Sequence, residues 1–474
     1  MSTDLFDRFL STPAMTEVFG TAAIVQAMLD FEAALARAQA AEGLIPASAA
    51  APIAAACRVE LIDLDALVAT GSIAGTLAIP LVRQLTAAVA MSDAQAAGCV
   101  HWGSTSQDVI DTAMALATRR AVALLDTRLG ELTDALVDLA QRHGDAPMLG
   151  RTLMQPASVI SFGFKLLSWV APLVRARERL RRAADAALKL QLGGAVGTLS
   201  VMGERGERVA LHMARELGLA HAPGAWHTQR DDWVALGCEV GVLCGSLGKI
   251  AKDISLLAQG EIAELAEPSG DANGGKRGGS SAMPHKRNPV ASMIALAASL
   301  RAPHRVAALL AAMPQAHERG LGDWQAELAE WPALFLSAHG AVDALAGAAA
   351  GLMVDSARMR HNIDALNGLV FAEAAAMLLA PHIGKARAQA QLETLSRQTS
   401  AQRPLLPLAQ QAIAADAQLA ATIDAAALQA AFDADAAARQ ATTVAAAQWT
   451  DLRARASALN ARPLGPLSSK EVTS

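Results

Sequence analysis

The sequence of 474 residues contains no tyrosine, and aromatic side chains make up only 3% of it. Strands are enriched in aromatic and β-branched residues, whereas alanine and leucine favour helices. Alanine dominates the composition, and hydrophobic residues account for 53% of the chain. We find no credible strand pattern and no repeat with a period of about 20 to 50 residues. The composition therefore predicts an all-α protein with a large buried core.

Cysteine is also scarce, and no two cysteines form a Cys-x-x-Cys pair. This spacing indicates neither a structural zinc site nor a disulfide framework. Disulfides are rare in the reducing cytoplasm, so we expect free thiols there. We predict no metal and no cofactor. The cysteines are Cys57, Cys99, Cys238 and Cys244.

An excess of positive charge is missing, because the formal net charge is −5. Proteins that bind nucleic acid show a basic face, so nucleic acid is not expected as a partner. The opening stretch, MSTDLFDRFL, carries acids where a secretory signal needs cations. No apolar run approaches the roughly 18 residues of a membrane-spanning helix. The sequence thus predicts a cytoplasmic protein without a membrane segment.

The chain does contain long segments rich in alanine and leucine. In the segment 16–43, Ile24, Met28, Phe31 and Leu35 recur at steps of four and three, which is helical spacing. Such segments must bury a wide apolar stripe on one another, as in a helix bundle. The longest are expected at about 106–143, 151–192, 225–267, 290–313 and 317–351, the last with a kink at Pro332.

The positions of these segments predict three domains. An N-terminal helical domain covers residues 1–100, and the central bundle of long helices covers residues 101–351. The remainder, residues 352–474, contains shorter helical segments punctuated by prolines. We expect it to form a small C-terminal helical domain.

Four polar stretches interrupt the apolar segments, and each is expected to precede a long helix. The N–H groups and the positive dipole end of a helix N-terminus suit carboxylates. Taken singly, Thr105 and Ser106 are typical helix caps, and Gln155 and Gln229 are ordinary helix-end amides. Their joint occurrence indicates a functional site. The stretches are WGSTSQD, GRTLMQPA, WHTQRDD and GSSAMPHKRNP.

The longest interruption, residues 268–289, is rich in glycine and carries no acid after Asp271. Long loops without regular structure are mostly either functional or solvated and disordered. Its polar core, residues 280–288, holds hydroxyls, an imidazole, two cations and an amide. Such groups can receive an anionic substrate and the negative charge that develops on it.

The order of residues in this loop resembles the signature of the fumarase/aspartase superfamily, which includes argininosuccinate lyase and adenylosuccinate lyase. The stretches GSTSQD, GRTLMQPA and HERGLGDW resemble further segments of the family, and the resemblance spans about residues 5–400. The loop agrees with the signature at Gly279, Ser280, Ser281, Met283, Pro284, Lys286, Asn288 and Pro289.

The resemblance implies a three-domain all-α fold with a central five-helix bundle. It also implies a homotetramer in which each active site collects segments from three subunits. The family reaction adds or removes a group across a double bond next to a carboxylate, through a carbanion held as an aci-carboxylate. By the resemblance, Ser280 transfers the proton, Lys286 has a catalytic role, and Lys286 and Asn288 hold a carboxylate. Further implied substrate contacts are His101, Ser104, Thr105, Ser106, Gln155, Gln229, Ser281, Met283 and Arg319.

The sequence departs from the C–N lyases of the family at Leu153, where they carry a histidine in a THxQ arrangement. A hydrophobic residue removes the general acid that a leaving amine needs. Leu328 replaces an arginine after Glu327, and Ser11–Thr12 replaces the arginine–tyrosine pair of adenylosuccinate lyase. These departures resemble one branch, the 3-carboxy-cis,cis-muconate cycloisomerases of bacterial protocatechuate breakdown. There a carboxylate of the substrate is the nucleophile, and no leaving-group acid is needed.

Lactone formation still requires a proton donor. Ser280 is our first candidate and Lys286 the second, while His101 and His285 are weaker candidates, since a lone histidine often has a structural role. The expected partner is a small anionic polycarboxylate. Two other functions stay open at this point. A C–N lyase acting on adenylosuccinate or argininosuccinate is disfavoured by Leu153, and a catalytically silent protein is disfavoured by the intact loop signature.

Overall fold

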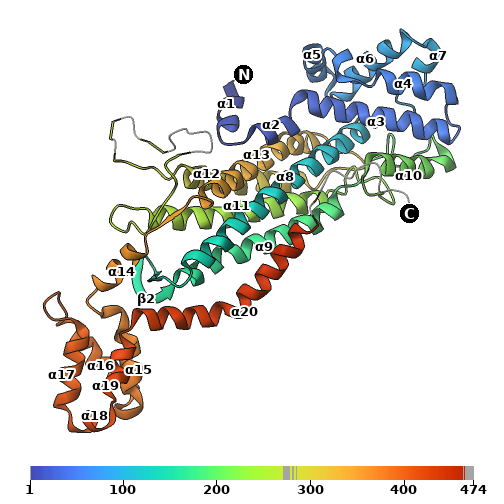
Figure 1. Cartoon of the computed structure of the whole chain (residues 1–474). Coiled ribbons are helices and arrows are strands. Elements are labelled where there is room, and N and C mark those ends of the chain that lie inside the picture. The colour runs from blue at the N-terminus through green and yellow to red at the C-terminus, as the bar shows by residue number, and fades with distance from the viewer. Residues whose placement is uncertain (1, 271–277, 280–281, 284, 463, 465–474) are drawn as a thin grey trace.

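Five long helices lie side by side in the centre of an elongated molecule (Figure 1). The computed structural model describes residues 2–270, 278–279, 282–283, 285–462 and 464. Its helices are α1 (Ser2–Phe9), α2 (Pro13–Val18), α3 (Thr21–Ala41), α4 (Ala50–Ala56), α5 (Leu64–Ala74), α6 (Ala78–Ala90), α7 (Ala94–Ala97), α8 (Ser106–His143), α9 (Phe162–Ala187), α10 (Gly206–Leu217), α11 (Asp231–Leu257), α12 (Val290–Ala312), α13 (Asp323–Ala349), α14 (Ser356–Asp364), α15 (Ala372–Ile383), α16 (Lys385–Ser396), α17 (Leu405–Ala415), α18 (Ala417–Thr422), α19 (Ala425–Ala431) and α20 (Ala434–Asn460). Short 3₁₀ turns cover Ala47–Ala49, Val59–Leu61, Gly203–Arg205 and Leu369–Phe371, and the strands are β1 (Pro147–Thr152), β2 (Gln155–Ser161), β3 (Leu265–Ala266) and β4 (Met353–Val354).

The central bundle consists of α8, α9, α11, α12 and α13, which alternate in direction. The indole N–H of Trp324 donates to Asp111 and that of Trp331 donates to Thr118, so α8 and α13 run parallel. Helix α11 runs with them, while α9 and α12 run the opposite way. With 38 residues, α8 is about 57 Å long, at about 1.5 Å per residue. The predicted all-α fold with a five-helix bundle is thereby confirmed.

The bounds of two bundle helices match the prediction closely, and three are shorter than expected. Helices α8 and α12 begin where the polar stretches placed them, at Ser106 and Val290. Helices α9, α11 and α13 each begin six or more residues after the predicted start. A β-hairpin occupies the difference before α9, and residues without helical structure occupy it before α11 and α13. The predicted helix 16–43 is divided at Gly20 into α2 and α3.

A β-hairpin occupies residues that we expected to open a long helix, so the prediction of no strands is wrong. Strands β1 and β2 pair antiparallel, with Thr152 opposite Gln155. Leu153 and Met154 form the two-residue turn between them, both with positive φ, 50° and 68°. Positive φ at both positions is the signature of a type I′ turn, which normally selects Asn-Gly. Because Leu-Met lacks that signature, the turn was not recognisable in the sequence.

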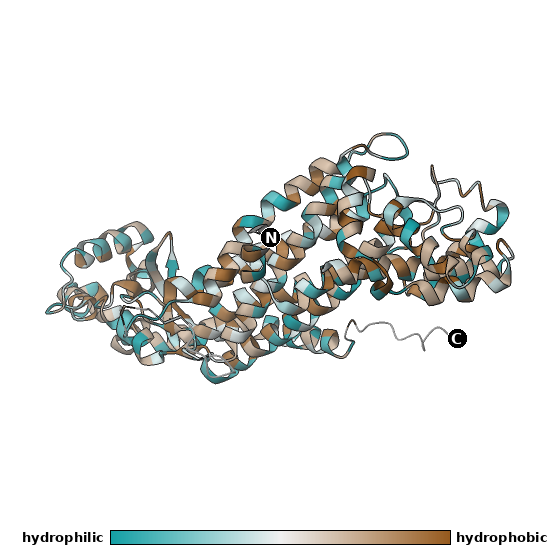
Figure 2. Ribbon diagram, turned by 90° about the horizontal axis from the view of Figure 1, so that it is seen from above, coloured by the Kyte–Doolittle hydropathy of each residue, from teal (hydrophilic) through white to brown (hydrophobic). Residues whose placement is uncertain are grey.

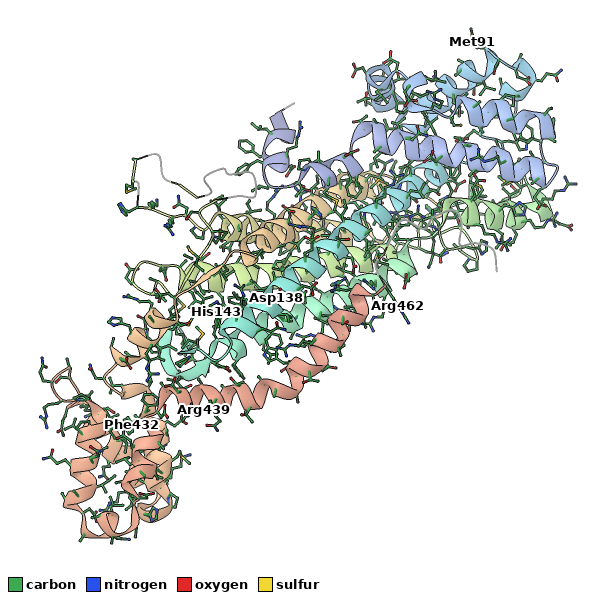
Figure 3. The ribbon with its side chains drawn as sticks, in the orientation of Figure 1. Met91, Asp138, His143, Phe432, Arg439 and Arg462 are labelled. Carbon is green, nitrogen blue, oxygen red and sulfur yellow. The ribbon has the colours of Figure 1, made fainter. Side chains whose placement is uncertain are left out.

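Groups of shorter helices lie at the two ends of the bundle (Figure 1). Helices α4 to α7 adjoin α3 at one end, and α15 to α19 pack around a small core of their own at the other. Helix α20 returns from this second group along α9 and α8. Figure 3 labels Phe432 just before α20 and Arg462 just after it, at opposite ends of this return. The proposed boundaries of the three domains stay a prediction.

Two bundle helices are more apolar than we expected from the sequence. By length and composition alone, α11 and α12 are long and apolar enough to cross a membrane. Hydrophobic stretches recur along the helices in the centre of the molecule (Figure 2). Within the chain, 56% of the most apolar window of α11 is buried, but only 22% of that of α12. Helix α12 therefore presents an apolar surface that the described residues cover only in part.

Candidate functional site

The N-terminus of α8 gathers several of the predicted site residues. Thr105 is the N-cap of α8, and its N–H donates to the Asp108 carboxylate at 3.0 Å. The Arg319 guanidinium, from the segment before α13, donates to Thr105 Oγ1 at 2.6 Å and to Ser106 Oγ at 3.1 Å. A fixed guanidinium beside a helix N-terminus is a favourable place for a carboxylate. We call His101, Ser104, Thr105, Ser106 and Arg319 the α8 cluster.

His101 joins this cluster through a buried acid that the sequence did not single out. Its Nδ1 lies 2.6 Å from Oε1 of Glu32 on α3 and 2.9 Å from Ser104 Oγ. The Glu32 side chain is completely buried, whereas one fifth of the His101 side chain is exposed. His101 has a positive φ of 59°, an uncommon conformation for a residue other than glycine. The loop before α8 is therefore held in one defined shape.

A second buried acid, Asp108, connects the start of α8 to the segments before α10 and α11. Its carboxylate accepts hydrogen bonds from the backbone N–H groups of Gly193 and Gly194, at 3.0 and 2.9 Å, and lies 2.8 Å from His227 Nε2. Gly194 has a φ of 69°, and a Cβ there would lie 2.9 Å from the carbonyl oxygen of Gly103. The glycine-rich segment before α10 is thus shaped by its contacts with Asp108 and Gly103.

A buried ion-pair network ties the starts of α8, α11 and α13 together. The Arg230 guanidinium donates to Asp111 at 2.9 Å and to Glu327 at 3.1 Å, and it lies 4.6 Å from the centroid of the Trp226 ring. The Trp324 indole N–H also donates to Asp111, at 2.9 Å. Burial alone disfavours the cation, but the two carboxylates outweigh it and raise the pKa of Arg230. Glu327 is not followed by an arginine as in the C–N lyases. It pairs instead with Arg230, directly before α11.

Gln229 lies at the same end of the bundle as the α8 cluster, directly before α11. Its side chain is exposed, and its amide nitrogen donates to the Ala225 carbonyl at 3.3 Å. No hydrogen bond joins its side chain to a described residue of the α8 cluster. The prediction that Gln229 binds substrate therefore stays a prediction, although the residue is free to turn toward a ligand.

Gln155 and Leu153 lie at the tip of the β-hairpin, at the opposite end of the bundle. Leu153 is 96% exposed and Met154 is 69% exposed. The hairpin is anchored at its base, where the Arg151 guanidinium donates to both oxygens of the buried Glu264, at 3.0 and 2.6 Å. The tip is thus a firmly held projection that contacts little of its own chain.

Lys286 and Asn288 also lie at this second end, in the part of the loop that is described. The Asn288 N–H donates to the Gly278 carbonyl at 2.8 Å, and Lys286 is exposed. A cleft of about 780 Å³ adjoins both residues and His285, between the segment that follows α11 and strand β4. Met283, also predicted as a contact, is 44% exposed. We call Lys286, Asn288 and Met283 the loop cluster.

The predicted catalytic Ser280 and its neighbour Ser281 lie outside the described residues. Their roles stay predictions.

The N-terminus of α12 is closed by an acid of the protein itself. The Glu267 carboxylate accepts hydrogen bonds from the backbone N–H groups of Ala291 and Ser292, both at 2.9 Å, and from Ser292 Oγ at 2.7 Å. We expected this helix end to receive a substrate carboxylate. Glu267 occupies these donors, so the backbone N–H groups of Ala291 and Ser292 are not free to receive a substrate carboxylate. The carboxylate-binding role of Lys286 and Asn288 stays a prediction.

The α8 cluster and the loop cluster are too far apart to contact the same small molecule within one chain. The first lies at the start of α8, and the second lies beyond the end of α11, which runs parallel to α8. Helix α11 has 27 residues and is therefore about 40 Å long, and this length lies between the two clusters. The residues brought together in one chain are thus only part of the site that the sequence predicted.

The acids that hold these clusters were the main residues missed by the sequence analysis. Glu32, Asp108, Asp111, Glu264 and Glu267 are all buried. A charged residue among apolar helical neighbours was the available signal, because a buried charge is rarely found without a partner. The sequence did not reveal the partners, since Glu32 and His101 are 69 residues apart and Asp111 and Arg230 are 119 apart.

Comparison with known proteins shows the family to which the chain belongs. A family model described as "Lyase" matches residues 8–302. A 3-carboxy-cis,cis-muconate cycloisomerase of Pseudomonas aeruginosa is 48% identical over 84% of this chain and 86% of its own, and one of Bradyrhizobium diazoefficiens is 45% identical over 90% and 92%. The crystal structure of 3-carboxy-cis,cis-muconate lactonizing enzyme from Pseudomonas putida superposes with a TM-score of 0.87 and 39% identity, covering 96% of this chain and all of that one. The chain therefore belongs to this lyase family, within the fumarase/aspartase superfamily that its loop signature indicated.

Proposed function

We propose that this protein is an enzyme that closes 3-carboxy-cis,cis-muconate to a carboxymuconolactone. The observation that carries the proposal is the 45 to 48% identity, over 84 to 90% of the chain, to proteins named for that reaction. Leu153 supports it chemically. An aliphatic side chain at the hairpin tip supplies no acid for a leaving amine, and a reaction without a leaving group needs none. The alternative of a C–N lyase acting on adenylosuccinate or argininosuccinate is disfavoured on both grounds.

The reaction makes two bonds to carbon and releases nothing. A carboxylate oxygen of the substrate attacks one carbon of a C=C bond, and the neighbouring carbon becomes a carbanion held as an aci-carboxylate. A proton from the enzyme then completes the C–H bond. We assign this proton to Ser280, with Lys286 as the second candidate. The substrate carboxylates that do not react are assigned to Lys286, Asn288, Arg319 and the hydroxyls of the α8 cluster. Preorganised cations and donors stabilise such an intermediate strongly because they need no rearrangement during the reaction.

We propose further that the active site is completed by assembly into a homotetramer. The two clusters lie at opposite ends of a bundle about 57 Å long, so the α8 cluster of one subunit has to meet the loop cluster and hairpin of others. The uncovered face of α12 supports this arrangement, since Leu300 is 71% exposed and Met293 48% exposed. Exposed apolar surface of this extent marks interaction sites. We infer bundle-to-bundle packing through α12.

The four cysteines agree with a cytoplasmic location in this proposal. All are free thiols, and Cys57 and Cys244 are buried. Burial raises the pKa of both thiols to about 12, so they stay protonated and unreactive. The cytoplasm is where such thiols persist, and we place the reaction there, in the breakdown of protocatechuate.

The direct test is turnover of synthetic 3-carboxy-cis,cis-muconate by the purified protein. We expect the diene absorbance to disappear and NMR to identify a lactone as the product. Adenylosuccinate and argininosuccinate, offered under the same conditions, should remain unchanged. Loss of either of these two, with the muconate intact, would show that the protein is a C–N lyase.

Ser280→Ala should lower kcat by about 10²- to 10⁴-fold, the usual contribution of a proton-transfer group. Because only a hydroxyl is removed, we expect the unfolding midpoint to stay within the range of the wild-type protein. Ser72→Ala is the matched control, since Ser72 is an exposed serine on the distant helix α5. A Ser280→Ala enzyme with wild-type kcat would transfer the role of donor to Lys286.

A further inference from the structure

The Glu32–His101 pair has features that a surface ion pair lacks. Glu32 Oε1 contacts His101, and Glu32 Oε2 is buried without a hydrogen-bond partner among the described residues. An ionised carboxylate taken out of water is costly unless it is paired. His101 is the only cation that the described residues bring within ion-pair distance of Glu32. The imidazole of His101 is therefore the one group among the described residues that can neutralise Glu32.

The imidazole has two nitrogens, and the contact with Glu32 occupies one of them. Nδ1 faces both Glu32 and Ser104, so this nitrogen carries its proton toward Glu32. Nε2 makes no hydrogen bond to any residue that the structure describes. The partner at one ring nitrogen decides the protonation and aim of the other. The exposed part of His101 is thus available to a substrate at the α8 cluster.

Helix α3 holds the backbone around His101 as well as its side chain. Gln39, two turns after Glu32 and also fully buried, donates to the Trp102 carbonyl at 2.6 Å. His101 and Gly103, on either side of Trp102, both have positive φ. One face of α3 therefore fixes a strained loop at two successive residues, as is expected where strain is retained for function.

We propose that Glu32 is a positioning residue, which holds His101 through Nδ1 so that Nε2 serves as a hydrogen-bond donor to a substrate carboxylate at the α8 cluster. This inference rests on the proposed function, because it supposes a polycarboxylate substrate. It adds a donor to the site, next to Arg319 and the hydroxyls of Thr105 and Ser106. A purely structural ion pair would hold the loop but would leave binding indifferent to the charge of His101.

The charged groups around His101 agree with a donor that stays protonated. They are Glu32 on α3 and Asp108 in the first turn of α8. Burial alone disfavours the imidazolium, but the charge and hydrogen bond of Glu32, with the charge of Asp108, outweigh it and raise the pKa of His101 above its ordinary value of 6.5. A raised pKa means that the cation is present at low pH and is lost as the pH rises through the folded-state value. Substrate binding through Nε2 should weaken over that same range.

The test combines a titration and a pH profile. In the wild-type protein, the His101 ring proton, assigned with His101→Gln, should titrate above 6.5 by NMR. In Glu32→Gln the midpoint should fall, and the alkaline limb of kcat/KM should move to lower pH with it. At neutral pH we expect KM to rise and kcat/KM to fall by about 10- to 100-fold, as for other groups that orient a functional histidine. Glu32→Asp, which keeps the charge, should restore much of the loss.

Glu42→Gln is the matched control. Glu42 lies directly after α3 and pairs with a histidine, His212, outside the site. It should leave both the titration of His101 and the pH profile unchanged. The proposal is overturned if His101 titrates at or below 6.5 in the wild-type protein, or if Glu32→Gln folds and keeps the wild-type profile. The wild-type titration does not depend on the Glu32→Gln variant, so it decides even if Glu32→Gln does not fold. Failure of the proposed function would appear separately, as a wild-type protein that does not turn over the muconate.

Discussion

Tetramers assembled from an equal mixture of Arg319→Ala and Lys286→Met subunits are expected to recover about a quarter of the wild-type activity, because random assembly of a symmetric oligomer gives about that share of sites with both clusters intact. Each variant alone should be nearly inactive. Arg319 belongs to the α8 cluster and Lys286 to the loop cluster, at opposite ends of the bundle. When the two residues of one site come from different subunits, some mixed sites contain neither substitution. The measurement is kcat per subunit after the two variants are unfolded together and refolded.

The control for this experiment is a mixture of two variants from the same cluster, Arg319→Ala and Ser106→Ala. Arg319 donates to Ser106 within one chain, so every site made from this mixture carries one of the two substitutions and no activity should return. Native mass spectrometry establishes that mixed tetramers have formed. If they form and the first mixture stays inactive, the two clusters do not share a site, and the proposed assembly is wrong.

Arg230→Met is expected to lower the free energy of unfolding by about 3–5 kcal/mol, the usual cost of removing one partner of a buried ion pair. Asp111 and Glu327 would be left as two buried carboxylates without their common cation. The three residues come from the starts of three bundle helices, so the loss should also loosen the platform under the α8 cluster. Urea unfolding at a fixed protein concentration, with the turnover rate measured alongside, tests both effects.

Arg208→Met supplies the comparison for the buried network. Arg208 pairs with Glu42 at 2.6 Å, but its side chain is 56% exposed. An exposed pair contributes about 0–1 kcal/mol, so this variant should differ little from the wild-type protein. If Arg230→Met lost as little stability as Arg208→Met, the buried network would not contribute to the stability of the fold as its burial indicates.

The parts of the fold that the sequence predicted are those governed by local chemistry. The start of α8 was predictable because Thr105 and Asp108 form a capping pair within one turn. The start of α12 was predictable because Pro289 breaks the preceding segment. The hairpin was missed because its turn carries Leu153 and Met154 where glycine or asparagine is the usual signal. At the hairpin, the local rule failed because the turn residues break it.

The site was predictable as a set of residues, but its arrangement was not. The resemblance to a family identified Thr105, Arg319 and Lys286 in the sequence, and the structure brings the first two together while separating the third. Nothing in the order of residues states which end of a bundle helix they reach. The same holds for Glu32 and His101, because a pairing over 69 residues depends on how α3 lies across the start of α8. Spatial relationships of this kind require the packed structure.

The turn at Leu153 and Met154 has a consequence for how this protein could be stabilised. Left-handed backbone conformations cost ordinary residues about 1–3 kcal/mol each, and these two side chains are 96% and 69% exposed, so the chain gains little from burying them. Asn-Gly would form the same turn with less strain and would remove two apolar side chains from solvent. A search for stabilising substitutions would therefore select this hairpin early. The hairpin tip is therefore a place where the stability of a single subunit can be raised without touching its core.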